Sequence, residues 1–189
     1  MKKIIAIVGM PGAGKTEAAE HLATKGIPFV RFGEITDEGV KALGLPLTQK
    51  NERMFREKLR QELGMAAYAL KMKPKIDEFL KDHKVIVLDG LYSWEEYVFL
   101  KKEFPSLILV NIFAEPPIRY ERLSKRSIRP VSHQDARDRD ILELEKLNKG
   151  GPIAIADYTV ENNTDNISEL HNKIDSLLLR LGLRLNDLP

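Results

Sequence analysis

The amino-acid sequence predicts an α/β fold in which helices flank a mostly parallel sheet. Short apolar runs rich in β-branched residues recur along the chain, and they are continuous rather than alternating. Continuous runs are typical of strands that are buried on both faces. The segments between the runs are long enough to be the crossover helices that parallel strands require. A turn with three glycines follows the first run directly, and it lies where ligands bind in such sheets, at the carboxyl end of a strand.

Each element has a signal of its own in the sequence. The runs expected to form strands are Ile4–Val8, Ile27–Phe32, Val85–Leu88, Leu107–Phe113 and, more weakly, Tyr158–Glu161. The segments expected to form helices are Lys15–Lys25, Lys50–Met72, Ser93–Phe104, Pro116–Arg126, Ser132–Asn148 and Asn166–Leu181. The Ser93-Trp94-Glu95-Glu96 segment matches a capping box, which indicates a helix start. The last helix carries apolar residues at helical spacing and is expected to pack on the sheet.

Composition excludes several classes of protein. The length of 189 residues fits one domain, or one domain with an inserted flap. The net charge is +2, so no strong positive field indicates a nucleic-acid partner. The absence of cysteine excludes disulfides and thiolate metal sites and fits a reducing compartment. The start of the chain lacks the apolar length of a signal peptide, and no segment is apolar enough to span a membrane. A cytoplasmic protein with no membrane partner is therefore expected.

The glycine-rich turn matches the phosphate-binding loop pattern G-x-x-x-x-G-K-[ST], the P-loop. Its residues are Gly9, Met10, Pro11, Gly12, Ala13, Gly14, Lys15 and Thr16. Backbone N–H groups wrap phosphates in such a loop, and glycine allows both the close approach and the unusual dihedral angles. The pattern lies between an expected strand and an expected helix, which is the context it requires. It therefore predicts nucleotide-phosphate binding by Gly9, Pro11, Gly12, Ala13, Gly14, Lys15 and Thr16.

Two residues of this loop have specific expected roles. Lys15 places a compact positive charge on the β- and γ-phosphates, and the Thr16 hydroxyl is a candidate ligand of Mg²⁺. The helix that follows directs its positive N-terminal end at the anion. A P-loop alone does not distinguish a kinase from a GTPase or a motor ATPase.

Acidic residues follow two other expected strands. Ligands in such sheets bind at the carboxyl ends of the strands. Asp89 ends the third run and is placed to hold a Mg²⁺-bound water, although a turn-forming Asp-Gly pair is the alternative. Glu34 follows the second run, where its carboxylate would accept a proton from an attacking hydroxyl. An acid in the first turn of a helix is an equally good interpretation of Glu34.

Arginines occur in two clusters. Arg53, Arg56 and Arg60 share one helical face, and surface ion pairs explain the first two, whereas Arg60 stays open as a phosphate contact. The charged Lys125–Asp140 segment is a candidate mobile flap. Its arginines are Arg126, Arg129, Arg137 and Arg139, of which Arg126 and Arg137 are the best candidates for closing over a transferred phosphoryl group. The neighbouring acids favour a salt-bridged surface helix instead.

Several motifs together resemble a known family. "IVGMPGAGKTEAA", "FGE", "LRQELG", "VIVLDGLYSWEE", "SHQDARDRDILEL" and "IADYTVEN" resemble, in this order, a mostly archaeal family of nucleotide-kinase-like P-loop proteins. That family in turn resembles dephospho-CoA kinases. The resemblance implies a three-layer P-loop NTPase fold with a five-stranded parallel core. It also implies a helical acceptor region around Thr36–Lys73 and a lid around Arg126–Gly150.

The resemblance further implies a chemistry and a set of site residues. It implies ATP and Mg²⁺ as cofactors, Glu34 as a candidate base, Arg60 as a phosphate contact, Arg137 as a lid arginine and Asn162 near the adenine. The leading hypothesis is a small-molecule kinase with a nucleotide-like acceptor, existing as a monomer or homodimer. A regulatory P-loop NTPase without such an acceptor is the alternative. The four histidines match no metal-ligand spacing and are expected at the surface.

Overall fold

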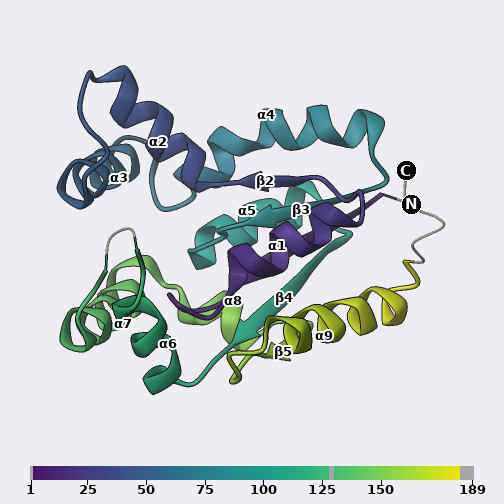
Figure 1. Cartoon of the computed structure of the whole chain (residues 1–189). Helices are drawn as coiled ribbons and strands as arrows, with labels where there is room; N and C mark the ends of the chain where they lie inside the picture. The colour runs from purple at the N-terminus through teal and green to yellow at the C-terminus, as the bar shows by residue number, and fades with distance from the viewer. Residues whose placement is uncertain (1, 128–129, 184–189) are drawn as a thin grey trace.

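The computed structural model describes residues 2–127 and 130–183, and its centre is an all-parallel sheet (Figure 1). The strand order is β2-β3-β1-β4-β5. The strands are β1 (Lys3–Val8), β2 (Phe29–Arg31), β3 (Val85–Asp89), β4 (Leu107–Phe113) and β5 (Tyr158–Glu161). Every neighbouring pair runs parallel, so the predicted sheet of five strands is confirmed.

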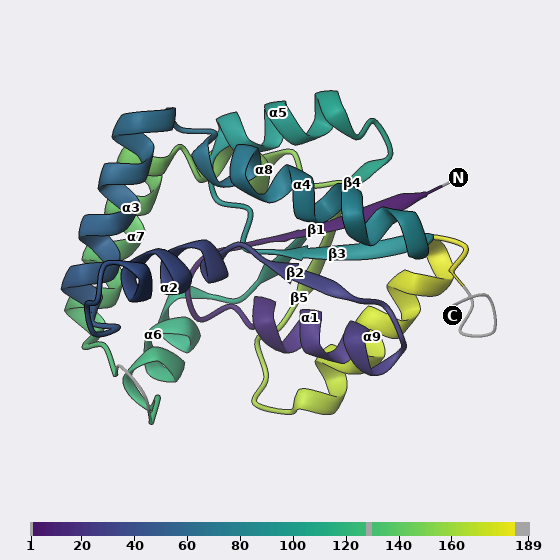
Figure 2. The same ribbon diagram turned by 90° about the horizontal axis from the view of Figure 1, so that it is seen from above.

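Helices cover both faces of this sheet (Figure 2). They are α1 (Lys15–Thr24), α2 (Gly33–Ala42), α3 (Gln49–Leu63), α4 (Ala67–Asp82), α5 (Trp94–Glu103), α6 (Pro116–Ser124), α7 (His133–Leu147), α8 (Gly150–Ala154) and α9 (Ile167–Arg180). Helices α1 and α9 lie on one face, and α4 and α5 lie on the other. Helices α2, α3, α6 and α7 lie beyond the carboxyl ends of the strands, at the left of both views.

The central strand β1 shows why the apolar runs are continuous. Ile5 and Ile7 belong to the core on the α1 and α9 side, together with Leu22 and Ile174. Ile4, Ala6 and Val8 belong to the core on the opposite side, which α4 and α5 cover. Alternate residues of a strand point to opposite faces, so a strand covered on both faces needs apolar residues at every position. The sheet edge at the carboxyl ends is left for polar residues.

One predicted helix is wrong in its boundaries. The Lys50–Met72 segment is not a single helix, because α3 ends at Leu63 and α4 begins at Ala67. Gly64 follows α3 with a φ of 77°, which is the left-handed region that ends helices at glycine. Helix α4 also continues beyond Met72 and contains Pro74.

The sequence predicts no helix at α8, and it indicates α2 only through the first-turn interpretation of Glu34, which does lie in the first turn of α2. Helix α2 contains Gly33 and Gly39, and the short α8 contains Gly150, Gly151 and Pro152. Glycine and proline have low intrinsic helix propensity, so packing rather than local preference forms these two helices. The capping box at the start of α5 is confirmed: the Ser93 side chain accepts from the Glu96 N–H, and the Glu96 side chain accepts from the Ser93 N–H. No helix in the part of the chain that the structure describes has the length and apolarity to cross a bilayer.

Candidate functional site

The glycine-rich loop joins β1 to α1 in a conformation that depends on glycine. Gly9 has a φ of 138°, and a β-carbon there would lie 2.3 Å from the carbonyl oxygen of Ile112 in β4. Gly14 has a φ of 101°, and a β-carbon there would lie 2.4 Å from Nδ2 of Asn162. Real β-carbons do not approach other atoms this closely. Dihedral angle and space therefore both require glycine at these positions.

Side chains from other elements hold the carbonyl groups of this loop. Asn162 Nδ2, just after β5, donates to the carbonyl oxygen of Ala13 at 2.8 Å. Arg119 Nη1, from α6, donates to the carbonyl oxygen of Pro11 at 3.0 Å. Both side chains are buried. Lys15 Nζ donates to the carbonyl oxygen of Met10 at 3.1 Å and so lies along the loop.

Arg119 was not predicted from the sequence, although it connects three parts of the site. Its guanidinium also forms a two-bond ion pair with Asp140 of α7, with contacts of 3.1 and 2.6 Å. Such forked pairs fix geometry as well as adding attraction. Arg119 therefore links the loop, α6 and α7. In the sequence it is one charged residue among many in its segment, and only the packing shows that it is buried.

Thr16 and Asp89 come together as the sequence indicates. Asp89 ends β3, which is hydrogen bonded to β1, and Thr16 Oγ1 donates to Asp89 Oδ2 at 3.1 Å. Burial raises the pKa of Asp89, against the opposing effect of Lys15, the Thr16 hydroxyl and Arg31. A hydroxyl and a carboxylate so close together are the hard oxygen donors that suit Mg²⁺. This donor pair fits the ion, since Mg²⁺ needs few protein ligands beside phosphate and water.

The ammonium group of Lys15 lies in an unusual electrostatic environment. Burial and then the positive charge of Lys149 lower the pKa of Lys15 to about 7, while Glu143 and Asp89 act in the opposite direction. Lys149, at the start of α8, is almost completely buried and forms an ion pair with Glu143 of α7. Its Nζ lies 4.4 Å from the centre of the Tyr92 ring. No sequence pattern indicates this contact, because charged residues such as Glu143 and Lys149 are expected at the surface.

The lid arginines are distributed over two sides of α7. Arg139 Nε donates to Glu143 at 2.9 Å and so belongs to the group around Lys149. Partial burial and then the positive charge of Arg139 lower the pKa of Arg126, which follows α6. Arg137 is exposed and lines a different cavity, beside Met10. Arg129 lies outside the residues that the structure describes.

The two predicted acceptor-side residues both have partners. Glu34 lies in the first turn of α2, and its carboxylate forms an ion pair with Lys75 of α4. The Arg60 guanidinium lies 4.9 Å from the centre of the Tyr68 ring, and its Nη2 lies 3.9 Å from Oε1 of Glu96. Arg60 Nε is buried and makes no hydrogen bond with the described part of the chain. The Nε–H group of Arg60 can thus still donate a hydrogen bond to another acceptor atom.

Glu96 is the completely buried carboxylate beside Arg60. Burial raises the pKa of Glu96 to about 7, although the N–H groups of Tyr92 and Ser93 and the charge of Arg60 oppose the shift. Its Oε2 accepts from those two N–H groups at 2.8 and 3.2 Å. Glu96, the acidic residue of the α5 capping box, therefore also contacts α3, which carries Arg60.

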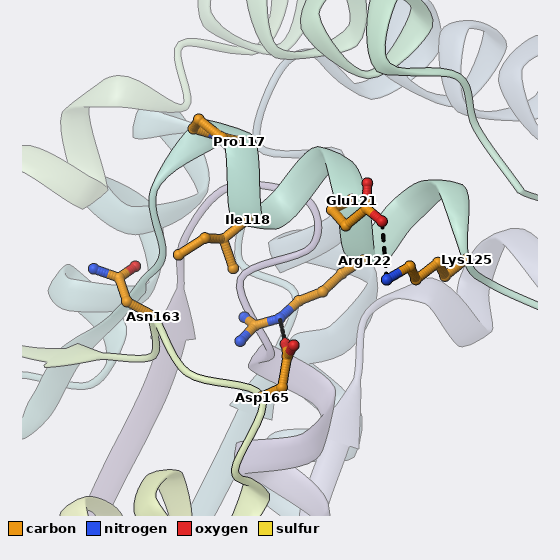
Figure 3. A pocket seen from close by; sticks show the side chains of 7 residues that line it. All are labelled: Pro117, Ile118, Glu121, Arg122, Lys125, Asn163 and Asp165. Atoms are coloured by element: carbon orange, nitrogen blue, oxygen red, sulfur yellow. Dashed lines mark ion pairs between the residues drawn. The ribbon is translucent and has the colours of Figure 1, made fainter.

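A cavity of about 500 Å³ lies beside α6 (Figure 3). Residues of α6 and of the loop between β5 and α9 line it: Pro117, Ile118, Glu121, Arg122, Lys125, Asn163 and Asp165. Arg122 connects the two walls, because it donates to the carbonyl oxygen of Asn162 at 2.9 Å and lies 3.6 Å from the Asp165 carboxylate. Since Asn162 also bonds to Ala13, the hydrogen bonds from Arg122 to Asn162 and from Asn162 to Ala13 connect a wall of this cavity to the glycine-rich loop.

The prediction that all four histidines are surface residues is wrong for His21. His21 is buried between α1 and α9, and its ring stacks on that of His171 with 3.9 Å between the centroids. Each ring nitrogen Nε2 contacts a carboxylate at 2.8 Å, Asp175 for His21 and Glu17 for His171. These contacts fix α9 against the helix that follows the loop.

Comparison with known proteins identifies the family. Residues 5–143 match a family model described as an AAA domain. A UPF0200 protein from Thermococcus sibiricus is 37% identical over 185 residues, which cover 96% of each chain. The chain belongs to the UPF0200 family. Another member, from Methanocaldococcus jannaschii, is 35% identical over 177 residues, covering 93% of this chain and 88% of the relative. The expected resemblance to an archaeal P-loop family is confirmed.

Solved structures confirm the fold class. Shikimate kinase from Bacteroides thetaiotaomicron matches with a TM-score of 0.62 at 16% identity, over 96% of this chain and 99% of that chain. TT1252 from Thermus thermophilus matches with a TM-score of 0.63 at 18% identity, over 95% and 98% of the two chains. At these identities the likeness concerns the fold alone. This UPF0200 member has a P-loop kinase-like α/β fold.

Proposed function

We propose that the protein is an ATP- and Mg²⁺-dependent kinase that phosphorylates a small, nucleotide-like acceptor. The observation that carries this proposal is the arrangement at the end of β1. A glycine-dependent loop, the Lys15 ammonium and the paired oxygens of Thr16 and Asp89 lie at one edge of the sheet. Amide groups, one lysine and a hard-oxygen pair are what a metal-bound triphosphate requires.

The nucleotide would extend from the loop into the neighbouring cavity. In this proposal Gly9 to Thr16 hold the phosphates, and Thr16 and Asp89 hold the Mg²⁺ and its water. The metal would supply charge neutralisation on the phosphate oxygens. The nucleobase of the nucleotide would lie between α6 and the 163–165 loop, where Ile118 offers an apolar surface. Asn162 would connect the phosphate site with the nucleobase site, because its side chain donates to Ala13 of the loop and its carbonyl oxygen accepts from Arg122 of the cavity wall.

The acceptor would bind on the side of α2, α3 and α4, between Glu34, Arg60 and Asp89. The Arg60 guanidinium lies over the Tyr68 ring, and its Nε has no hydrogen-bond partner among the described residues, so it would bind a phosphate group. Glu34 would act as the general base. For this its carboxylate must leave the ion pair with Lys75 and accept a hydrogen bond from the acceptor hydroxyl. Dephospho-CoA is the first acceptor to test, followed by nucleoside monophosphates.

Residues of α7 would complete the site. The segment from Arg126 to Gly150 is proposed as a lid that excludes water, with Arg126 and Arg137 as the arginines that close over the transferred group. Lys15 holds the phosphate oxygens throughout. Such a lid matters because water is otherwise the competing acceptor of the γ-phosphoryl group.

The test is incubation with ATP, Mg²⁺ and a panel of hydroxyl- and phosphate-bearing metabolites, with products identified by mass. ADP formation that depends on one acceptor, together with an acceptor that gains one phosphoryl group, is the expected result. Lys15→Ala is expected to abolish turnover while circular dichroism shows an unchanged fold. Steady hydrolysis that no acceptor alters would instead indicate a regulatory NTPase, and undiminished turnover in Lys15→Ala would contradict the mechanism.

A further inference from the structure

Lys149 is the most deeply buried cation in the described part of the chain, with 1% of its surface exposed. It lies between the end of α7 and α8, where Asn148 takes a left-handed conformation with φ 50°. Its ammonium has one carboxylate partner among the described residues, Glu143, and faces the Tyr92 ring. Removing a lysine from water costs several kcal/mol, which one ion pair only roughly offsets. Stability alone is therefore a weak explanation for Lys149.

Among the side chains in direct contact with Lys149 and its partner, positive charge is in surplus. Glu143 accepts from both Arg139 and Lys149, so two cations share one carboxylate. Of the other buried acids, Asp140 is already engaged by Arg119 in a two-bond ion pair, and Glu96 has Arg60 as its own cation. A buried group of this kind attracts an anion.

This group lies at the same edge of the sheet as the glycine-rich loop. Tyr92 follows Asp89 by three residues, and its ring would lie 3.3 Å from a β-carbon on Gly90. The group therefore packs at the carboxyl end of β3, next to the strand that leads into the loop. The electrostatic effect of Lys149 on Lys15 agrees with this placement. The anion that the surplus would attract is thus one bound at Lys15.

We propose that Lys149 is a second phosphate-binding lysine, which contacts the terminal phosphoryl group of a nucleotide bound on the loop. Glu143 and the Tyr92 ring hold its ammonium in the conformation described above. This inference rests on the proposed function, because it needs a nucleoside triphosphate at Lys15.

To reach a phosphate, the Lys149 ammonium must leave Glu143, and the contact between Glu143 and Arg139 makes this movement feasible. When Lys149 turns from Glu143 to a phosphate, Arg139 stays 2.9 Å from the same carboxylate. Glu143 then keeps a cationic partner and is never a buried, unpaired charge. Lys149 in turn exchanges one anion for another.

The experiment compares Lys149→Met with Lys146→Met, which removes an exposed lysine from the last turn of the neighbouring α7. Calorimetry measures the affinity of each variant for ATP·Mg²⁺ and ADP·Mg²⁺. Loss of Lys149 is expected to weaken ATP binding by about tenfold or more and ADP binding by less than about twofold. Lys146→Met is expected to bind both nucleotides like the wild type. Equal weakening for both nucleotides, or none, would overturn the proposal.

A second variant keeps the test valid if Lys149→Met does not fold. Glu143→Gln weakens the hold on Lys149 and retains a hydrogen-bond acceptor for Arg139. It is expected to tighten ATP binding relative to ADP binding, and an unchanged ratio would contradict the role of Lys149. If the wild type binds neither nucleotide, the proposed function itself fails, which is a different result from a wild type that binds ATP without the help of Lys149.

Discussion

Gly14 has room for hydrogen and for nothing larger. Its β-carbon would lie 2.4 Å from the Asn162 amide that holds Ala13, and its φ of 101° is strained for any other residue. Gly14→Ala is therefore expected to displace Asn162 and distort the loop, with at least a tenfold loss of ATP affinity, roughly 1.4 kcal/mol or more. Calorimetric titration with ATP·Mg²⁺ measures this loss. Gly44→Ala is the comparison, because Gly44 also has a positive φ but has open space around it.

Glu96 makes stability depend on pH. Its pKa of about 7 in the folded protein exceeds the ordinary value of 4.5, so the folded protein keeps a proton that the unfolded chain has lost between these pH values. Stability therefore falls as pH rises from about 4.5 to 7. Glu96→Gln removes this ionisation and keeps an oxygen for the α5 cap. The free energy of unfolding of the wild type is expected to fall between pH 5 and pH 8 by roughly 2 kcal/mol more than that of Glu96→Gln.

Urea unfolding of both proteins at the two pH values checks this prediction. The same stability difference at pH 5 and pH 8 would show that Glu96 does not titrate in this range. Lys102→Gln, at an exposed position in the last turn of the same helix, serves as a control for the loss of a charge from α5.

Single residues also mark the limit of what the sequence predicts about the site. The contact between Thr16 and Asp89 follows from two local patterns and from the rule that parallel strands end at one edge. Lys149 and Glu143 carry no such pattern, since burial of a charged residue depends on how α7 and α8 pack. Lys15, Thr16 and Asp89 were therefore predictable, whereas the group around Lys149 was not.

Among the elements, α2 and α3 pack so closely that one position has no room for a side chain. A β-carbon at Gly39 of α2 would lie 2.0 Å from Cζ of Phe55 in α3. Gly39→Ala is expected to push Phe55 away and to destabilise the protein by about 1–3 kcal/mol, even though alanine favours helix. Urea unfolding measures the loss, and Phe55→Leu in the same background is expected to restore part of it. A variant as stable as the wild type would show that α3 shifts without cost.

The elements show a second limit of the sequence. The helical pattern from Lys50 to Met72 is real, but Gly64 divides it, and a glycine within a helical pattern is ambiguous until its φ is known. Helix α2 is indicated only by the first-turn interpretation of Glu34, because a glycine such as Gly39 weakens a helical pattern. In the fold Gly39 is instead the point at which the Phe55 ring fits.

At the scale of the whole molecule, the apolar runs were enough to predict the sheet. Continuous runs at β1, β3 and β4 require cover on both faces, and this implies parallel strands joined by helices. The strand order could not be derived in the same way, because it depends on which crossover passes over which face. The order β2-β3-β1-β4-β5 places the loop strand at the centre.

Nucleotide binding is expected to stabilise the whole molecule, since the proposed path touches β1, α6 and the loop after β5. At a nucleotide concentration 100 times the Kd, the gain is about 2.7 kcal/mol, which raises Tm by roughly 5–10 °C. Thermal unfolding with and without ATP·Mg²⁺ measures this shift. Gly14→Ala at the same nucleotide concentration is expected to show about half of this gain or less, because a tenfold higher Kd leaves about 1.4 kcal/mol. A wild-type Tm that neither ATP nor GTP changes would contradict nucleotide binding.

The outer strands of the sheet are its shortest. Strand β2 has three residues and β5 has four, whereas the central β1 has six. An outer strand exposes unpaired N–H and C=O groups on which another chain can add a strand, and a short one gives such an addition little length. We therefore expect the protein to resist edge-to-edge aggregation, even though its central strands are long, apolar and rich in β-branched residues.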